Sequence, residues 1–200
     1  MELIDQANIF RYHTQLINES EVGSNTALGW NDHKSQEVRF KILSEIGSLD
    51  GHSVLDAGCG HGDLYPYLIK IYPQLQYYGI EQIPRFLEVA VERYGHLPDT
   101  HFYQGDFTNP GLPSVDYTII CGSLNYRNSD ESFVFTTIEK LFHNSRIGIG
   151  FNLLSELAEP NDFLQAWLPG EIMNHCRKLT AHLRLVENYY GKDFTVLMYH

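Results

Sequence analysis

The stretch VLDAGCGHGDL, residues 54–64, decides the fold of this 200-residue chain. A short apolar strand ends at Asp56, then Gly58, Gly60 and Gly62 alternate with other residues, and a helical pattern begins directly after them. Alternating glycines let the backbone turn sharply and let a ligand approach where a Cβ atom would clash. A strand, a glycine-rich turn and a helix in this order predict an α/β protein with a ligand site at the turn.

Strand-like and helix-like hydrophobic periods alternate along the rest of the chain, which is typical of α/β proteins. We predict a Rossmann-like, doubly wound sheet of seven strands, mostly parallel, with helices on both faces. The sequence NYYGK, residues 188–192, has the character of a hairpin connection, so we expect the last strand to run antiparallel. The expected strands are 53–56, 76–80, 101–104, 115–121, 146–151, 179–186 and 194–199, and the expected helices are 35–46, 63–72, 84–94, 130–142 and 170–178, the fourth capped by Ser129.

The length of the chain fits one domain, because single hydrophobic cores grow to roughly 250 residues before chains split. We expect residues 35–200 to form that domain. Residues 1–34 carry Tyr12, Trp30 and His33 among polar residues, and they predict an irregular or loosely helical segment packed over the domain. Two roles are open for this segment: a lid over a pocket, or a wrap on the surface.

The acidic composition excludes several classes of function. A formal net charge of −11 repels phosphate backbones, so we expect neither DNA nor RNA as a partner. The three cysteines are widely spaced and the ten histidines form no HxxxH or HxH pair, which predicts no disulfide framework and no metal site. The N-terminus MELIDQANIFRYH has an early acid and no long apolar run, so we expect no signal peptide, no membrane partner and a cytoplasmic location.

The charges around the glycine turn distinguish two classes of nucleotide ligand. A dinucleotide site prefers GxGxxG and a free helix N-terminus that holds the pyrophosphate. Here Asp63 stands in place of the third glycine, so Asp56 and Asp63 flank the turn with negative charge. That charge opposes a pyrophosphate and suits a ligand with an ammonium or sulfonium group. S-adenosylmethionine (SAM) carries both groups.

VLDAGCGHGDL resembles the first motif of the class I (Rossmann-like) SAM-dependent methyltransferases, and the resemblance extends over residues 35–200. In that family an acid after the second strand binds both ribose hydroxyls, and the sequence YGIEQI places Glu81 there. FYQGDF falls where the family contacts the adenine, and VDYTIICGSLNY resembles the fourth-strand motif near the methionine moiety. The latter lacks the Asn/Asp-Pro-Pro-Tyr sequence of members that methylate amino groups of bases or glutamine, which puts those substrates in doubt. The resemblance implies SAM as cofactor, held by Asp56, Gly58, Cys59, Gly60, Glu81, Gln82, Asp106, Phe107, Cys121 and Gly122.

Further site residues follow from the rule that doubly wound sheets bind ligands at the carboxyl ends of their strands. Arg39 lies in the first turn of the helix before the first strand, where it either binds the SAM carboxylate or forms a surface ion pair. Candidate bases that could take a proton from the acceptor are His13, His33 and Tyr126. The loop after the fourth strand and the hairpin offer the candidate substrate-binding residues Asn125, Arg127, Tyr189, Tyr190 and Lys192.

These observations predict an enzyme that transfers a methyl group from SAM to a compact small-molecule acceptor. The cationic side chains of Arg127 and Lys192 favour an anionic acceptor. Two alternatives stay open: a non-catalytic SAM-binding or interaction protein, and an NAD-dependent oxidoreductase, which the position of Asp63 disfavours. The sequence leaves the oligomeric state open.

Overall fold

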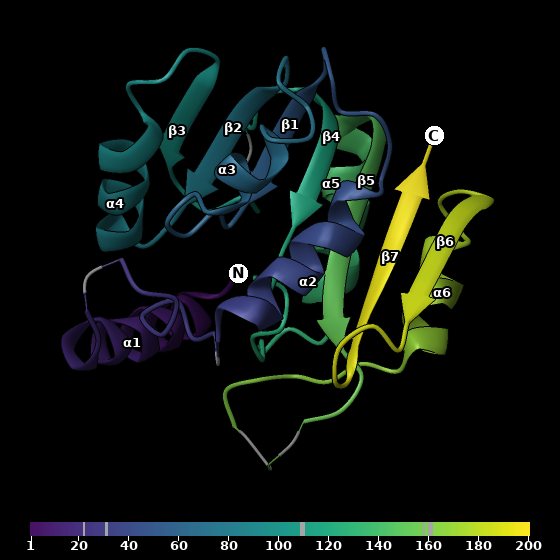
Figure 1. Ribbon diagram of the computed structural model, residues 1–200. Helices are drawn as coiled ribbons and strands as arrows, with labels where there is room; N and C mark the ends of the chain where they lie inside the picture. Colours follow the sequence, from purple (N-terminus) through teal and green to yellow (C-terminus); the bar gives the residue numbers. More distant parts are fainter. Residues whose placement is uncertain (22, 31, 109–110, 158, 160–161) are drawn as a thin grey trace.

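The chain builds one seven-stranded sheet with helices packed on both of its faces (Figure 1). The computed structural model describes residues 1–21, 23–30, 32–108, 111–157, 159 and 162–200. The order of the strands across the sheet is β3-β2-β1-β4-β5-β7-β6. Their bounds are β1 (Ser53–Ala57), β2 (Gln76–Glu81), β3 (Thr100–Gln104), β4 (Val115–Ile120), β5 (Ser145–Leu154), β6 (His182–Glu187) and β7 (Asp193–Tyr199).

The strand directions confirm the predicted architecture. β1, β2, β3, β4 and β5 pair in parallel, whereas β7 runs antiparallel to both of its neighbours, β5 and β6. All residues of β1 are buried, as expected for a strand covered on both faces. Because the chain continues from β1 to β2 on one side and returns to β4 on the other, the carboxyl end of β1 lies at the point where the strand order reverses.

The helices divide between the two faces of the sheet. Leu43 of α2 and Leu64 of α3 belong to one core cluster, which lies on one face of β1 and β4. Ile138 of α5 and Ile172 of α6 belong to a second core cluster, on the opposite face. α4 packs against β2 and β3. The helix bounds are α1 (Leu3–Glu19), α2 (His33–Ser44), α3 (Leu64–Leu68), α4 (Pro84–Tyr94), α5 (Phe133–Asn144) and α6 (Pro169–Cys176).

The N-terminal segment contains a regular helix, α1, where the sequence predicted irregular or loosely helical structure. Its buried residues are Asp5, Ile9 and His13, which recur at every fourth position and so share one helix face. Because Asp5 and His13 are polar, this buried face is not visible as an apolar stripe in the sequence. The Asp5 carboxylate accepts hydrogen bonds from the backbone N–H and the hydroxyl of Ser129 at 3.1 and 2.6 Å, which fixes α1 to the loop after β4.

Two predicted boundaries near this loop are wrong, and tertiary contacts explain both. Ser129 binds Asp5 instead of capping the next helix, and α5 begins later, with Ser132 at its N-cap position. β5 continues past the predicted end at residue 151 to Leu154. The polar residue Asn152 stays in the strand because its Oδ1 accepts a hydrogen bond from the backbone N–H of Gly122 at 2.8 Å.

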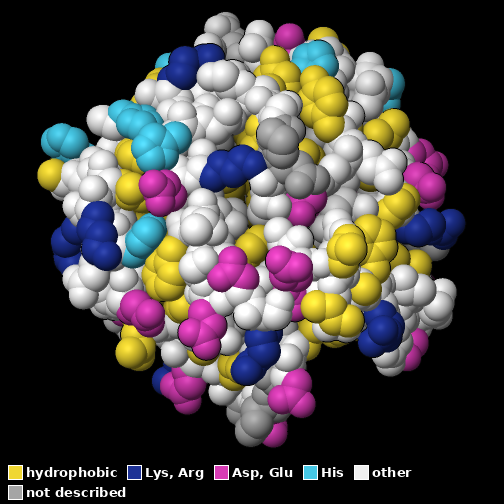
Figure 2. All heavy atoms as spheres, turned by 180° about the vertical axis from the view of Figure 1, so that it is seen from behind, with side chains coloured by type: hydrophobic (Ala, Val, Ile, Leu, Met, Phe, Trp, Pro, Cys, Tyr) yellow, Lys and Arg dark blue, Asp and Glu magenta, His cyan; other side chains and the backbone are white. Residues whose placement is uncertain are grey.

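The surface carries charges of both signs. Acidic and basic side chains are interspersed over the face seen in Figure 2, with apolar side chains between them. Large apolar side chains that are well exposed include Leu3 and Ile4 of α1 and Leu168 before α6. In the described part of the chain, no helix combines the length and the apolar character needed to cross a membrane.

Candidate active site

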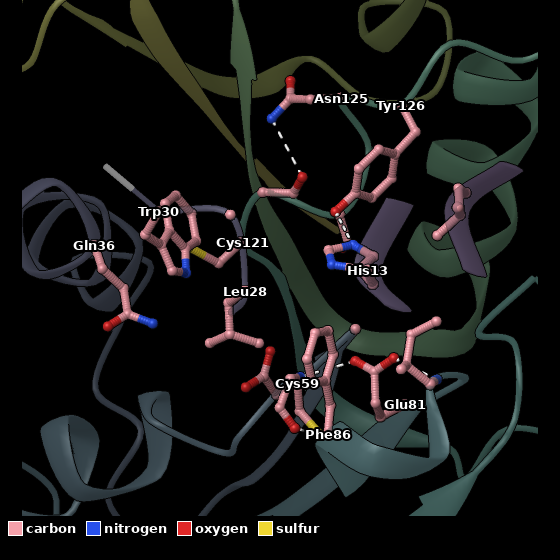
Figure 3. A pocket seen from close by; sticks show the side chains of 18 of the residues that line it. His13, Leu28, Trp30, Gln36, Cys59, Glu81, Phe86, Cys121, Asn125 and Tyr126 are labelled. Carbon is pink, nitrogen blue, oxygen red and sulfur yellow. Dashed lines mark hydrogen bonds between the residues drawn. The ribbon is translucent and has the colours of Figure 1, made fainter. Parts of the chain in front are cut away.

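A cavity of about 250 Å³ lies at the carboxyl ends of β1, β2 and β4, where the strand order reverses (Figure 3). Its floor is formed by the glycine turn after β1, by Glu81 and Gln82 at the end of β2, and by Cys121 and Gly122 after β4. Its remaining walls include residues of α1, the segment between α1 and α2, and Phe86 of α4. Small-molecule sites typically have volumes of roughly 300–1,000 Å³, so this cavity is small.

Two side chains of the N-terminal segment, Leu28 and Trp30, occupy space above the floor, because they pack directly on two of its glycines. Gly60 has a φ of 56°, and a Cβ atom added there would lie 2.8 Å from Cδ2 of Leu28. Gly122 has a φ of 79°, and its Cβ atom would lie 2.8 Å from Cη2 of Trp30. Both backbone conformations favour glycine, and at both positions a Cβ atom would force the overlying side chain to shift. The N-terminal segment therefore covers the glycine turn that the sequence predicted as the ligand site.

Asp56 is a buried carboxylate in the cavity wall, and it has a single side-chain partner in the described structure. It accepts a hydrogen bond from the hydroxyl of Tyr77 at 2.5 Å. Burial, with a smaller contribution from the charges of Glu81 and Asp63, raises the pKa of Asp56 to about 7, against the lowering effect of the Tyr77 hydrogen bond. At neutral pH this carboxyl group is therefore divided between its neutral and its charged form, so a cationic ligand would shift it toward the charged form.

Glu81 is the second buried carboxylate in the wall. Its Oε2 accepts a hydrogen bond from the backbone N–H of Gly60 at 2.9 Å, and its Oε1 accepts one from the backbone N–H of Ile83 at 2.8 Å. Burial raises the pKa of Glu81, and these backbone hydrogen bonds oppose the rise. The two bonds fix the plane of the carboxylate while each oxygen keeps a lone pair, so Glu81 can still accept hydrogen bonds from two neighbouring hydroxyls.

The sequence predicted that Asp63 would contribute negative charge to the ligand site, but in the structure its carboxylate is paired outside the cavity wall. Its Oδ1 forms an ion pair with Nη1 of Arg93 at 3.1 Å, and its Oδ2 accepts a hydrogen bond from Gln36 at 3.4 Å. Nη2 of the same arginine donates to the carbonyl of Gly23 at 2.8 Å. Asp63 therefore connects the glycine turn to α4 and to the N-terminal segment. The negative charge that faces the cavity comes from Asp56 and Glu81.

Arg39 lines the cavity and forms a buried ion pair, whereas the sequence left SAM binding and a surface ion pair as alternatives. Its Nη2 lies 2.5 Å from Oδ2 of Asp193, whose side chain is 1% exposed. Its guanidinium group also lies over the rings of Trp30 and Tyr190, at 4.8 and 5.4 Å from their centres. Nη1 donates to the carbonyl of Ser35 at 2.6 Å, but the buried Nε has no hydrogen-bond partner within the described ranges. Asp193 and Ser35 therefore hold the guanidinium group at the cavity wall, with its Nε enclosed by protein atoms.

The structure brings together two of the three candidate bases. Nε2 of His13, in α1, lies 2.8 Å from the hydroxyl of Tyr126, in the loop after β4, and both residues line the cavity (Figure 3). Burial lowers the pKa of His13 to about 4, and the nearby carbonyl of Ala27 opposes this shift. Burial raises the pKa of the Tyr126 hydroxyl well above its usual range. At neutral pH, His13 is therefore uncharged and Tyr126 keeps its proton.

The third candidate base and several predicted ligand residues lie outside the cavity wall. His33 is exposed and pairs with Glu37 at 3.5 Å. Nζ of Lys192 forms a surface ion pair with Glu156 at 2.8 Å. The side chain of Asp106 is turned toward its own backbone, since its Oδ1 accepts a hydrogen bond from the N–H of Thr108 at 2.8 Å.

The remaining predicted substrate residues have structural contacts. The hydroxyl of Tyr189 lies 2.8 Å from Oγ1 of Thr195, and the Tyr190 ring packs on Arg39. The backbone N–H of Arg127 donates to the carbonyl of Phe163 at 2.8 Å. Asn125 does line the cavity, but its Oδ1 accepts a hydrogen bond from the backbone N–H of Leu154 at 3.0 Å. The other predicted cofactor residues all line the cavity: Gly58, Cys59, Gly60, Gln82, Phe107, Cys121 and Gly122.

Sequence reasoning missed several wall residues, and most of them are aromatic or aliphatic. Leu28 has no pattern around it that would have indicated a site, while Trp30 was noticed only as part of an unassigned segment. Phe86 lies five positions after Glu81, in the first turn of α4, so its closeness to the β2 motif could have indicated a place in the site. Further wall residues that were not predicted include Ile9, Tyr12, Phe40, Ser123 and Leu164.

The described residues of the site form neither a disulfide bond nor a cluster of metal ligands. Cys59, Cys121 and Cys176 are free thiols, and the first two line the cavity. Across the described ranges, no three His, Cys, Asp or Glu side chains are grouped in a way that could hold a metal ion. Burial raises the pKa of the Cys59 and Cys121 thiols, which keeps both in the unreactive protonated form.

Comparison with known protein families and sequences gives one consistent result. Residues 54–143 match the model of a family described as "Methyltransferase domain". A Mycobacterium tuberculosis protein named "Putative methyltransferase Rv1506c" is 26% identical over 162 residues, which cover 76% of this chain and 96% of that protein. The region that matches the family model begins at Val54, the first residue of VLDAGCGHGDL, and contains the residues that form the floor of the cavity.

Comparison with solved structures confirms the fold. Magnesium protoporphyrin IX methyltransferase from Synechocystis, with bound SAM, has a TM-score of 0.69 and 15% identity, and the match covers 98% of each chain. A SAM-dependent methyltransferase from Aquifex aeolicus has a TM-score of 0.63 and 21% identity, covering 84% of this chain and 94% of that one. Human N-acetylserotonin methyltransferase in complex with SAM has a TM-score of 0.63 and 17% identity, but this chain spans only 52% of its length.

Proposed function

We propose that this chain, which has the fold and the first motif of the class I SAM-dependent methyltransferases, is an enzyme that transfers a methyl group from SAM to a small-molecule acceptor. One observation carries the proposal: two buried carboxylates, Asp56 and Glu81, line one cavity, and neither forms an ion pair with a cationic side chain in the described structure. Burying a charge without a partner is costly. A ligand that brings its own positive charge would remove that cost.

The residues of the floor fit SAM group by group. Asp56 would face the positive charge of the methionine part, and the guanidinium group of Arg39 would attract its carboxylate. Glu81 would accept hydrogen bonds from both ribose hydroxyls, and the ring of Phe107 would pack against the adenine. When bound, SAM supplies a methyl group that its sulfonium charge already activates.

The chain's own contribution to catalysis would be alignment of the acceptor and exclusion of water. Methyl transfer is an in-line displacement, which needs no covalent intermediate with the protein, so its rate depends on holding the two reactants at near-attack distance. The pair His13–Tyr126 is the polar group placed to hold the acceptor, because it faces the cavity from the side opposite the glycine turn. We assign these two residues to acceptor orientation and proton handling.

A small-molecule acceptor is supported by the similar solved structures. The named acceptors of the similar structures, N-acetylserotonin and magnesium protoporphyrin IX, are small molecules. The net charge of −11 opposes binding to a nucleic acid. The free thiols fit a protein of the reducing cytoplasm.

Two other functions make different predictions. An NAD-dependent oxidoreductase would have to hold a pyrophosphate close to Asp56, which like-charge repulsion disfavours. A non-catalytic SAM-binding protein would use the same floor but would not turn over.

The decisive experiment is isothermal titration calorimetry of the full chain with SAM, with its demethylated product S-adenosylhomocysteine (SAH) and with NAD. We expect SAM and SAH to bind and NAD not to bind, and Glu81→Gln to weaken SAM at least tenfold because it replaces a charged acceptor of two hydroxyls. Lys192→Gln, on the surface, is the control and should leave the affinity unchanged. Absence of SAM binding to the unaltered chain would refute the proposal, whereas binding without methyl transfer to any acceptor would favour the non-catalytic alternative.

A further inference from the structure

One part of the cavity wall contains a connected group of aromatic rings. The rings of Tyr12 and Phe163 lie 4.1 Å apart between centres, and those of Phe163 and Tyr126 lie 5.0 Å apart. His13 lies between Tyr12 and Phe86, at 5.1 and 5.0 Å, in edge-to-face contacts. Of these residues, Tyr12, His13, Phe86 and Tyr126 line the cavity, and we call the five rings the aromatic wall. Aromatic surfaces of this kind bind planar ring systems by stacking and edge contacts.

The aromatic wall comes from four separate parts of the chain, which the fold holds together. Tyr12 and His13 belong to α1, Phe86 to α4, and Tyr126 to the loop after β4. Phe163 belongs to a segment that pairs with this loop, since the N–H of Arg127 donates to its carbonyl at 2.8 Å. The rings of the aromatic wall therefore pack on one another across four segments, and these contacts set their orientation toward the cavity.

The aromatic wall offers no charge to an acceptor. His13 is neutral at pH 7 because burial lowers its pKa to about 4. The cationic side chain that does line the cavity, Arg39, is held by Asp193 at 2.5 Å and lies on the side of Trp30 and Gly122. Lys192, which the sequence favoured as a partner for an anionic acceptor, is paired with Glu156 outside the cavity. These placements disfavour the anionic acceptor that we expected.

Tyr126 provides the polar contact within the aromatic wall. Its hydroxyl lies 2.8 Å from Nε2 of His13. When Tyr126 donates its proton to Nε2, its oxygen keeps lone pairs that can accept one hydrogen bond from a ligand. A ligand that brings an O–H donor would satisfy this buried oxygen, whereas a ligand with a carboxylate would place a second acceptor against it.

We propose that the acceptor is an uncharged, planar aromatic molecule with a hydroxyl group, bound by ring contacts with the aromatic wall and by a hydrogen bond from its hydroxyl to Tyr126. This inference rests on the proposed function, since it assigns the substrate class of the same site. Tyr126 then determines specificity: it selects a hydroxyl-bearing ring over the same ring without the hydroxyl. The hydroxyl oxygen held in this way would also receive the methyl group: the new O–CH3 bond forms as the S–CH3 bond of SAM breaks, and SAH leaves as a neutral thioether. The hydroxyl proton passes to the oxygen of Tyr126 as Tyr126 gives its own proton to Nε2 of His13.

The test uses the full chain with saturating SAH and three probes that share one ring system: 2-naphthol, naphthalene and 2-naphthoate. Their dissociation constants are measured by equilibrium dialysis at pH 7, where 2-naphthol is neutral and 2-naphthoate is an anion. We expect 2-naphthol to bind roughly two- to tenfold more tightly than naphthalene, the range given by one net hydrogen bond, and 2-naphthoate to bind the most weakly. Tyr126→Phe should remove the preference for 2-naphthol over naphthalene while both still bind.

Tyr117→Phe is the matched control, because Tyr117 is a buried tyrosine of β4 outside the cavity wall. It should leave the order of the three probes unchanged. The inference is overturned if SAH binds but none of the probes does, if 2-naphthoate binds as tightly as 2-naphthol, or if Tyr126→Phe keeps the preference. In each of these cases SAH binding, which is measured separately, still supports the cofactor assignment of the proposed function. If SAH itself does not bind, the proposed function fails and this inference fails with it.

Discussion

The affinity of the chain for SAM should depend on pH through Asp56. Burial raises the pKa of this carboxyl group to about 7, and a positively charged ligand beside it favours the ionised form. Binding should therefore release a proton from the fraction of molecules in which Asp56 is protonated. Affinity should be highest above pH 7 and should fall as the pH drops below the pKa of the free protein.

The magnitude follows from the protonated fraction. With a pKa of about 7, roughly one tenth of the carboxyl groups are protonated at pH 8 and roughly nine tenths at pH 6. If SAM binds only the ionised form, its affinity should fall about tenfold between these two values, or ~1.4 kcal/mol. Because stabilisation by a ligand grows with its affinity, the thermal stabilisation by SAM at one fixed concentration should be larger at pH 8 than at pH 6.

The assay is calorimetric titration of SAM at several values between pH 6 and pH 8.5, in two buffers of different ionisation enthalpy to count the released protons. Asp56→Asn is the reference, because any pH dependence that remains in this variant comes from groups other than Asp56, such as the amino group of the ligand. Subtracting it leaves the contribution of Asp56. Tyr77→Phe removes a hydrogen bond that lowers the pKa of Asp56, so it should move the midpoint to higher pH. The same pH dependence in Asp56→Asn as in the unaltered chain, or a midpoint shifted downward by Tyr77→Phe, would refute the reasoning.

Three more outcomes are expected. Asp193→Asn should lower the free energy of unfolding in urea by about 3–5 kcal/mol, because it leaves the buried Arg39 guanidinium without its counter-charge; a loss below ~1 kcal/mol would contradict this. In a Trp167→Phe background, the fluorescence of Trp30 should change as SAH is added, with the dissociation constant found by calorimetry, because Trp30 packs on Gly122 at the cavity floor; constant emission despite binding would show that Trp30 is not displaced. Lys192→Ala should change neither SAM affinity nor thermal stability measurably, since its ion pair is exposed, and a clear effect would return Lys192 to the site.

Much of the site could be predicted because it depends on local sequence. Asp56 and Glu81 each stand at the carboxyl end of a strand, next to residues whose apolar character identifies that strand. In a parallel sheet the carboxyl ends of neighbouring strands share one edge, so two such acids predict one site. The glycine turn is likewise local, because only glycine adopts the positive φ of Gly60 without strain.

The character of the aromatic wall could not be predicted, because its contacts join residues far apart in the chain. His13 and Tyr126 are separated by 113 positions; His13 is a buried polar residue that an amphipathic pattern would place at the surface, and Tyr126 is half-buried. The sequence also shows charges without showing their partners. Arg93 pairs with Asp63 from 30 positions away, so the charge that faces the cavity comes from Asp56 and Glu81 and not from Asp63.

The sequence by itself determined the order of the elements, the glycine turn and the two acids that face a positively charged ligand, since backbone conformation and hydrophobic period are properties of neighbouring residues. The tertiary structure alone decided which charges remain unpaired and which rings enclose the acceptor space. Those properties depend on distances between segments, and only the packed sheet with its N-terminal helix sets them.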